Sequence, residues 1–285
     1  MTPIQRTLLA AALLLAAPLL YAQASESAIN KQIGNLRSLS DDKRPAATIK
    51  LAADIRALPA GPSKVKLADA LAHLVTEGDQ GADALQAVGD ALSQALAQSP
   101  VPAKNDQPPM PYMDLARLVR YENVTTPLAD PLYVKAGQIL AANDDDIQKA
   151  DFSLKDFTGK KYALSELRGK IVVVNFWATD CKPCTTLEMP NLDVIYTHFQ
   201  PQGLIVLSIT DESTFKVFNT VNSWNYHYHP PILLDSGGKV AKQFHVDGIP
   251  RTFVFDRQGK LVAQAIDQCT QRQFLNMLAK TDLHP

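Results

Sequence analysis

The sequence has few cysteines and no excess of charge of either sign. Its 285 residues include 3 cysteines, and 28 Lys and Arg side chains offset 29 Asp and Glu side chains to a formal net charge of -1. This balance excludes the strongly basic composition with which many proteins bind nucleic-acid phosphates, so we expect no nucleic-acid partner. An odd set of three cysteines also excludes a small secreted domain held together by several structural disulfides.

Long apolar runs are missing as well, except for one near the N-terminus. Leu8 to Leu20 is apolar, and Arg6 is the only charged side chain before Glu26. Ala22-Gln23-Ala24 then supplies the small-x-small pattern at which signal peptidases cleave. The run is shorter than the roughly 20 apolar residues that span a bilayer. We therefore predict a signal peptide at residues 1–24 and an exported, periplasmic or otherwise extracytoplasmic protein, with an uncleaved membrane anchor as the alternative.

The segment at residues 25–145 has no cysteine and almost no strand-like run, and its apolar residues recur at helical spacing. Leu85, Val88, Leu92 and Leu96, for example, stand at positions i, i+3, i+7 and i+11 of one helix face. Such apolar faces must pack against one another, so we predict an all-α domain of unknown role. We expect helices over residues 41–58, 63–76, 81–98, 114–122 and 136–142, and a proline-rich loop over 100–111.

From residue 146 to residue 285 the pattern changes to alternating strands and helices. Ile171 to Trp177 is a continuous apolar run, which is typical of a strand buried on both faces of a sheet. We also predict strands over residues 160–163, 204–209, 232–234, 252–255 and 261–265, and helices over 183–199, 212–222 and 271–280. This order predicts an α/β domain with a central mixed sheet and helices on both faces.

Cys181-Lys182-Pro183-Cys184 directly follows the predicted buried strand and opens a helix. The thiolate is the species that attacks a disulfide, and the N–H groups and positive dipole end of a helix N-terminus stabilise it. One helical turn separates the two sulfurs, so the second can resolve a mixed disulfide made by the first. We assign Cys181 as the nucleophile and Cys184 as the resolving thiol. Lys182 favours the Cys181 thiolate, whereas the carboxylate of Asp180 opposes it.

Zinc binding is the other common use of a Cys-x-x-Cys pair, but it needs a second compact pair of ligands. The candidates are Cys269, His227 and His229, and they form no matching pair. We therefore predict no metal, and no cofactor beyond the redox-active cysteine pair. For Cys269 we expect a partly buried thiol without a redox role.

A proline at the start of a predicted strand is the second informative feature. Pro250 has no N–H to donate to a sheet, so Gly248-Ile249-Pro250 implies a sheet edge or a special turn, and a cis peptide bond is one way to build such a turn. Together with the segment from Trp177 to Cys184 and the upstream residues 152–170, it resembles the exported thioredoxins of the TlpA and ResA kind. The resemblance covers residues 150–285 and implies a thioredoxin-like fold there, preceded by the all-α domain.

This resemblance implies roles for further residues. The proline that matches Pro250 is cis in that family and lies beside the cysteine pair. The residue before it, here Ile249, offers backbone hydrogen bonds to a bound peptide. Trp177 corresponds to the family's aromatic residue beside the pair, although an ordinary core tryptophan is the alternative. Substrate binding is therefore expected at Ile249, Pro250 and Trp177.

The family's usual glutamate, three residues after the second cysteine, is displaced in this chain. Glu188 and Pro190 each lie one residue further along than the family pattern has them. One residue is about 100° around an α-helix, so Glu188 faces elsewhere unless a π-bulge absorbs the extra residue. We keep Glu188 as a candidate proton carrier or tuning residue. Asn175 stands where cytosolic thioredoxins have a buried acid.

These observations predict an exported thiol–disulfide oxidoreductase that reduces protein disulfides, with a membrane-linked electron donor as the resemblance implies. Two alternatives stay open. A peroxiredoxin-like peroxidase needs a proline and a threonine at set distances before its cysteine, but Thr179 is only two residues before Cys181 and the proline is missing. The other alternative is a partner-binding module, in which the helical domain binds and the thioredoxin unit is a scaffold.

Overall fold

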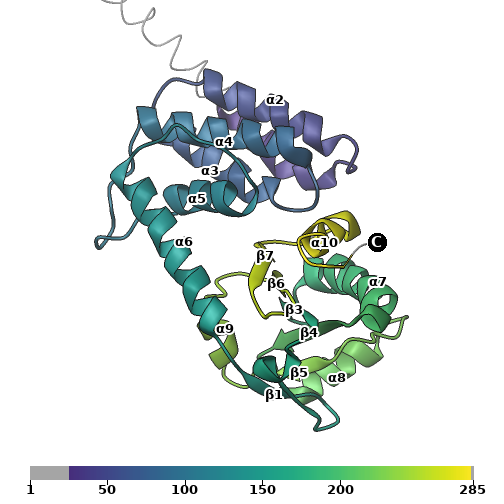
Figure 1. Cartoon of the computed structure of the whole chain (residues 1–285). Helices are drawn as coiled ribbons and strands as arrows, with labels where there is room; N and C mark the ends of the chain where they lie inside the picture. Colours follow the sequence, from purple (N-terminus) through teal and green to yellow (C-terminus); the bar gives the residue numbers. More distant parts are fainter. Residues whose placement is uncertain (1–25, 284–285) are drawn as a thin grey trace, which may run out of the picture. The chain divides into compact units, whose positions relative to one another are not determined.

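The computed structural model describes residues 26–283 and divides them into two compact units (Figure 1). The helical unit consists of residues 26–75 and 80–137, and the sheet unit of residues 76–79 and 138–283. The division at residue 137 falls within a helix, whereas the sequence pattern predicts it at residue 145. The predicted signal peptide at residues 1–24 lies outside the described residues. Across residues 26–283, no helix has both the length and the apolar character needed to cross a bilayer.

The helical unit is built from helices that each bury one apolar face. In α4 (Gly81–Gln98), Val88, Leu92 and Leu96 are fully buried, as their spacing predicts. α4 packs against both α2 and α3. The other helical segments are residues 26–35, η1 (Leu36–Ser38), α2 (Arg44–Ala57), α3 (Pro62–Val75) and α5 (Met110–Tyr121), and α6 (Pro131–Lys149) begins in this unit.

Two helices of this segment begin earlier than predicted, and proline is the reason in both. Pro111 lies in the first turn of α5, where the missing N–H has no helical partner to lose. α6 begins directly at Pro131, and Asp130 Oδ1 accepts a hydrogen bond from Leu132 N–H at 2.7 Å. Pro111, which the sequence pattern places in a loop, therefore marks a helix start in the structure, as Pro131 does.

The sheet unit contains a five-stranded sheet with the order β5-β4-β3-β6-β7. β4 is parallel to β3 and to β5, whereas β6 is antiparallel to both β3 and β7, so the sheet is mixed. β3 lies at the centre, and all of its residues are buried. β1 and β2 pair in a separate two-stranded sheet. The strands are β1 (Ser153–Lys155), β2 (Lys161–Ala163), β3 (Ile171–Phe176), β4 (Leu204–Thr210), β5 (Ile232–Leu234), β6 (Arg251–Phe255) and β7 (Leu261–Ala265).

Helices cover both faces of this sheet. Alternate residues of β3 point to opposite sides and all of them are buried, so each face packs against helices. Ile171 and Val173 pack under α7 and α10, and Val172 and Val174 pack against Phe244 at the end of α9. The predicted fold class is thus confirmed, including the all-α part that precedes the sheet. α9 is too short to give a periodic sequence signal and was not predicted. The helices of this unit are η2 (Leu164–Leu167), η3 (Cys184–Glu188), α7 (Met189–Phe199), η4 (Gln200–Gln202), α8 (Thr214–Asn222), α9 (Lys239–Gln243) and α10 (Gln271–Leu278).

Candidate redox site

The Cys-x-x-Cys motif lies where the central strand ends. β3 ends at Phe176, and the loop that follows leads into η3, a π-helix that continues as α7. Cys181 and Cys184 are joined by a disulfide at the start of this helix. Cys184 is fully buried, whereas Cys181 is partly exposed. Cys181 is therefore the cysteine that a second molecule can reach.

Two backbone N–H groups donate hydrogen bonds to Cys181 at the helix start. The N–H of Cys184 donates to Cys181 Sγ at 3.2 Å, and the N–H of Thr185 donates to the Cys181 carbonyl oxygen at 3.1 Å. After reduction, a thiolate at Cys181 has this donor and the positive end of the helix beside it. Asp180 and Lys182 flank Cys181 and are both exposed, so solvent screens their opposing charges. The local backbone thus favours an anionic sulfur at this position.

The loop that precedes β6 borders the disulfide. Cys181 Sγ lies 3.9 Å from the carbonyl oxygen of Ile249, a residue 68 positions further along the chain. The Ile249–Pro250 peptide bond is cis. Pro250 is buried, and the Ile249 side chain is 42% exposed. The structure therefore brings together Cys181, Ile249 and Pro250, with the side chain of Ile249 facing solvent next to the reachable sulfur.

Trp177 lies behind the disulfide and not on the surface. Its side chain is 2% exposed and packs in the apolar cluster that contains Cys184. Trp224 lies against it, with ring centroids 5.9 Å apart. Because the ring is buried, Trp177 supports the cysteine pair and presents no surface to a substrate in this structure. Lys182 is exposed, and its carbonyl oxygen accepts a hydrogen bond from Thr186 Oγ1 at 2.8 Å.

Glu188 reaches the protein interior because η3 is a π-helix. The N–H of Met189 donates to the carbonyl oxygen of Cys184, five residues earlier, so this turn accommodates one residue more than an α-turn. Of the two orientations that the sequence leaves open for Glu188, the structure has the one in which a π-turn absorbs the extra residue. Glu188 is fully buried.

Three groups donate hydrogen bonds to the Glu188 carboxyl group. Thr252 Oγ1 donates to Oε1 at 2.8 Å, and Asn175 Nδ2 donates to the same oxygen at 3.2 Å. The N–H of Cys269 donates to Oε2 at 2.6 Å. Burial raises the pKa of Glu188 to about 8, the Asp267 carboxylate also raises it, and the donors at Cys269 and Thr252 oppose the shift. The structure thus places a carboxyl group with a near-neutral pKa four residues after Cys184.

The partners of Glu188 could not be recognised in the sequence. Thr252 and Cys269 lie 64 and 81 residues away from it along the chain, and no local spacing links them. Only the pairing of β3 with β6, which sets Asn175 opposite Thr252, reveals part of the arrangement. Cys269 has a buried thiol, and its contact with Glu188 is made by its backbone.

Comparison with known proteins places this site in a family. The AhpC/TSA family matches residues 147–264. The thiol-disulfide oxidoreductase ResA of Bacillus thuringiensis (strain Al Hakam) is 35% identical over 131 residues, which are 46% of this chain and 74% of that protein. The chain belongs to the ResA family of thiol–disulfide oxidoreductases. The resemblance stated from the sequence motifs is confirmed.

Another member and two solved structures match a similar share of the chain. ResA of Bacillus subtilis (strain 168) is 33% identical over 132 residues, 45% of this chain and 72% of that protein. The crystal structure of the pneumococcal exposed lipoprotein thioredoxin Etrx1 from Streptococcus pneumoniae strain TIGR4 has 28% identity and a TM-score of 0.42, over 46% of this chain and 99% of that one. The crystal structure of StoA from Bacillus subtilis has 22% identity and a TM-score of 0.40, over 45% and 96%.

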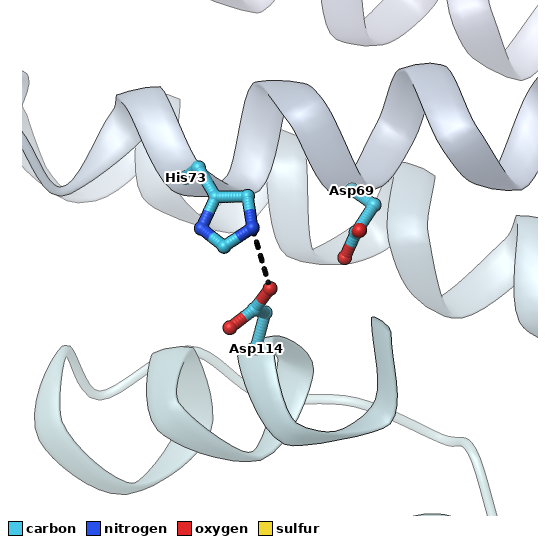
Figure 2. Close-up of side chains that lie close together, drawn as sticks. All are labelled: Asp69, His73 and Asp114. Carbon is cyan, nitrogen blue, oxygen red and sulfur yellow. Dashed lines mark ion pairs between the residues drawn. The ribbon is translucent and has the colours of Figure 1, made fainter. Parts of the chain in front are cut away.

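A second group of titratable side chains lies in the helical unit of this ResA-family protein. Asp69 and His73 of α3 point toward Asp114 of α5 (Figure 2), and their potential ligand atoms lie within 4.8 Å of one another. His73 Nε2 lies 3.1 Å from Asp114 Oδ2, and Arg117 Nη1 lies 2.9 Å from Asp114 Oδ1. Burial raises the pKa of Asp69 to about 7, and the neighbouring Asp114 carboxylate adds to the shift. Because the Arg117 guanidinium already compensates Asp114, we assign no metal to this group.

Proposed function

We propose that this member of the ResA family is an exported protein-disulfide reductase that works through a Cys181–Cys184 dithiol cycle. One observation carries the proposal. The cysteine pair lies at a helix start with one sulfur reachable beside the Ile249 carbonyl and the other buried. The relatives named thiol-disulfide oxidoreductase ResA support the class of reaction. The direction of electron flow is part of the proposal.

In the proposed cycle the reduced cysteine pair meets an oxidised substrate protein. The Cys181 thiolate attacks one sulfur of the substrate disulfide and forms a mixed disulfide, while the other substrate sulfur leaves as a thiolate and takes up a proton. The Cys184 thiolate then attacks Cys181 Sγ and releases the second substrate thiol. The substrate gains two electrons and two protons, and the Cys181–Cys184 pair is left as the disulfide that the structure contains.

In this proposal the ionised form of Glu188, a minor fraction at neutral pH because its pKa is about 8, accepts the proton that the Cys184 thiol loses before it attacks. Cys184 is fully buried, so its thiol has little access to bulk water as a base. Glu188 lies on the same π-helix, and a pKa of about 8 brings its proton affinity close to that of a thiol. The hydroxyl of Thr252 and the N–H of Cys269 hold the carboxyl group in one orientation.

Export and an external electron source complete the proposal. The signal-peptide pattern at residues 1–24 supports export. A reductase of protein disulfides is useful where disulfides persist, which is outside the cytosol. We propose that a membrane-linked reductase returns two electrons to the Cys181–Cys184 disulfide. The two sulfurs carry these electrons themselves, so the cycle uses no other cofactor.

Reduction of insulin tests this function. With dithiothreitol as the electron source, we expect the wild-type protein to reduce insulin at least about tenfold faster than Cys181→Ser, because the variant lacks the attacking thiolate. Cys184→Ser should instead accumulate a mixed disulfide with insulin, detectable by non-reducing electrophoresis. Equal rates for the wild type and Cys181→Ser would contradict the assignment.

The reduction potential of the Cys181–Cys184 couple tests the direction. A value more negative than about -200 mV supports a reductant, whereas a value near about -120 mV supports an oxidant. Consumption of hydrogen peroxide by the same preparation tests the peroxidase alternative. Peroxide turnover that exceeds insulin reduction would favour that alternative.

A further inference from the structure

The outward face of α8 presents aromatic side chains to solvent. Phe215 is 77% exposed and Phe218 is 54% exposed, and Phe215 is the most exposed of the large apolar side chains that the structure describes. The opposite face of the same helix is apolar as well, because Val217 is fully buried. A helix that packs by one face normally has polar residues on the other. Two exposed phenylalanines three residues apart therefore need a reason other than packing.

Hydrogen bonds tie the start of α8 to the loop that contains Cys181. The Glu212 carboxylate, two residues before α8, accepts hydrogen bonds from Thr179 N–H at 2.7 Å and Thr179 Oγ1 at 2.9 Å. Thr179 is two residues before Cys181. Lys216, which follows Phe215, pairs with Glu212 and is also attracted by the Asp180 carboxylate. The first turn of α8 thus lies next to the segment that leads into the reachable sulfur.

Packing beneath α8 gives an independent link to the redox site. Val217 lies in the apolar cluster that contains Trp177 and Cys184, and Cys181 and Val221 pack against the same cluster. The buried face of α8 therefore packs in the apolar cluster that lies behind the disulfide.

We propose that Phe215 and Phe218 form a docking surface for the protein whose disulfide exchanges with Cys181–Cys184. This inference rests on the proposed function and adds the chemistry of the partner, which presents apolar side chains within a few residues of its reacting cysteine. The partner must bring a sulfur to bonding distance of Cys181, so its neighbouring residues have to cover adjacent surface. Three residues of extended chain span about 10 Å, so residues that flank the reacting cysteine of the partner contact surface beyond Cys181 itself. Aromatic side chains are the usual anchors of such contacts.

The charges beside this surface favour a protein over a membrane. Asp211 and Glu212 precede α8, and Asp180 lies next to its first turn. Lys216 is the basic residue of the helix itself. Anionic membrane surfaces attract clusters of basic residues, and a site with more acidic than basic groups lacks that attraction. A short apolar segment of a protein needs no such charge.

Two disulfide-bridged peptides test the proposal. They have the same length and charge, but one carries Phe and Leu beside each cysteine and the other carries Ser. Hydroxyethyl disulfide serves as a small substrate with no flanking residues. The reduced full-length protein is expected to react with the apolar peptide about tenfold better in kcat/KM than with the polar one, mainly through KM. The double variant Phe215→Ser/Phe218→Ser is expected to lose this preference.

Val194→Ser is the matched control, because Val194 is a 51% exposed apolar residue that belongs to α7 and not to α8. It should keep the wild-type preference, and circular dichroism should show all variants folded. The proposed docking surface is overturned if the wild type shows no preference for the apolar peptide, or if the double variant keeps that preference. Two further results would also overturn it. One is a wild-type dimer in sedimentation that the double variant does not form, and the other is binding of the wild type, but not of the double variant, to phosphatidylglycerol vesicles. Failure of the proposed function itself is distinguishable, since the wild type then reduces neither the peptides nor hydroxyethyl disulfide.

Discussion

Glu188 is a carboxyl group at a position where an ionised side chain is unfavourable. It is fully buried beside Asn175 and Thr252, and its pKa is raised from 4.5 to about 8 mainly by burial. Since the folded pKa lies above the unfolded one, the fold favours the protonated form. The contribution of Glu188 to the free energy of unfolding therefore falls as pH rises from about 4.5 to about 8. The side chain is held neutral at neutral pH but close to the point at which it ionises.

Glu188→Gln removes this titration while keeping the size and shape of the side chain. We expect resolution of the mixed disulfide by Cys184 to slow by about 10- to 100-fold, because general acid–base catalysis is lost. We also expect the inflection near pH 8 in the rate profile to disappear. Stopped-flow measurement of Trp fluorescence between pH 6 and 9.5 checks both. Glu166→Gln changes an exposed glutamate and should leave the pH profile of the rate intact. If the inflection near pH 8 were unchanged in Glu188→Gln, another group would accept the proton.

Asp69 shows the same physical effect in the helical unit. Burial and the neighbouring Asp114 raise its pKa from 3.8 to about 7, so the free energy of unfolding should fall as pH rises between these values. We expect Asp69→Asn to remove this decline and to stabilise the protein at pH 8 by about 1–2 kcal/mol, a reduced value because Asp69 is partly exposed and solvent screens it. Urea unfolding followed by circular dichroism at pH 4 and pH 8 measures the effect. Asp42→Asn, at an exposed carboxylate, should show no such gain, and equal gains in both variants would argue against a special role of Asp69.

At the scale of single elements, η3 is the feature that decides the geometry of the site. An α-helix through residues 184–199 could not keep both the disulfide at the sheet end and Glu188 in the interior, because one extra residue rotates everything after it by about 100°. The π-turn confines the extra residue to Cys184–Glu188, and α7 continues with its apolar face on the sheet. Glu188 therefore occupies the interior despite its displaced position in the sequence.

This account predicts that one residue of the π-turn can be removed. Thr186 is exposed, and its deletion restores the spacing of the family pattern and allows an ordinary α-turn. We expect the shortened protein to remain folded, with insulin-reducing activity within about threefold of the wild type, because Cys184 and the glutamate keep their orientations. Deleting Val194 from the regular part of α7 serves as the comparison and should unfold the protein, since it rotates the buried residues that follow. Loss of folding in both deletions would mean that the π-turn is not a localised insertion.

At the scale of the whole molecule, local patterns predict the fold well. The apolar run at Ile171 to Trp177 predicts the central strand, and the spacing of Val88, Leu92 and Leu96 predicts the buried face of α4. Such patterns arise because burial on one or two faces dictates residue type directly. The Cys181–Cys184 pair was also predictable, because its chemistry depends on short spacing at a helix start.

The features that sequence did not reveal depend on distant residues or on small energy differences. A helix that contains one extra residue can form a π-turn or rotate, and packing against the sheet decides between them. The donors to Glu188 come from β6 and from the segment before α10. Asp69 and His73 share a helix face visible in the sequence, but only the packing of α5 brings Asp114 to them. Tertiary structure alone determines such neighbours.

The unequal exposure of the two cysteines has a consequence for how electrons pass through the protein. Cys184 is fully buried, so an incoming donor and an outgoing acceptor must both react at Cys181. The two cannot occupy that sulfur together, so in the proposed cycle the oxidised form reacts with the donor and the reduced form reacts with the acceptor. If the proposed cycle holds, donor and acceptor proteins therefore share one contact surface around Cys181, and each must fit the same few residues.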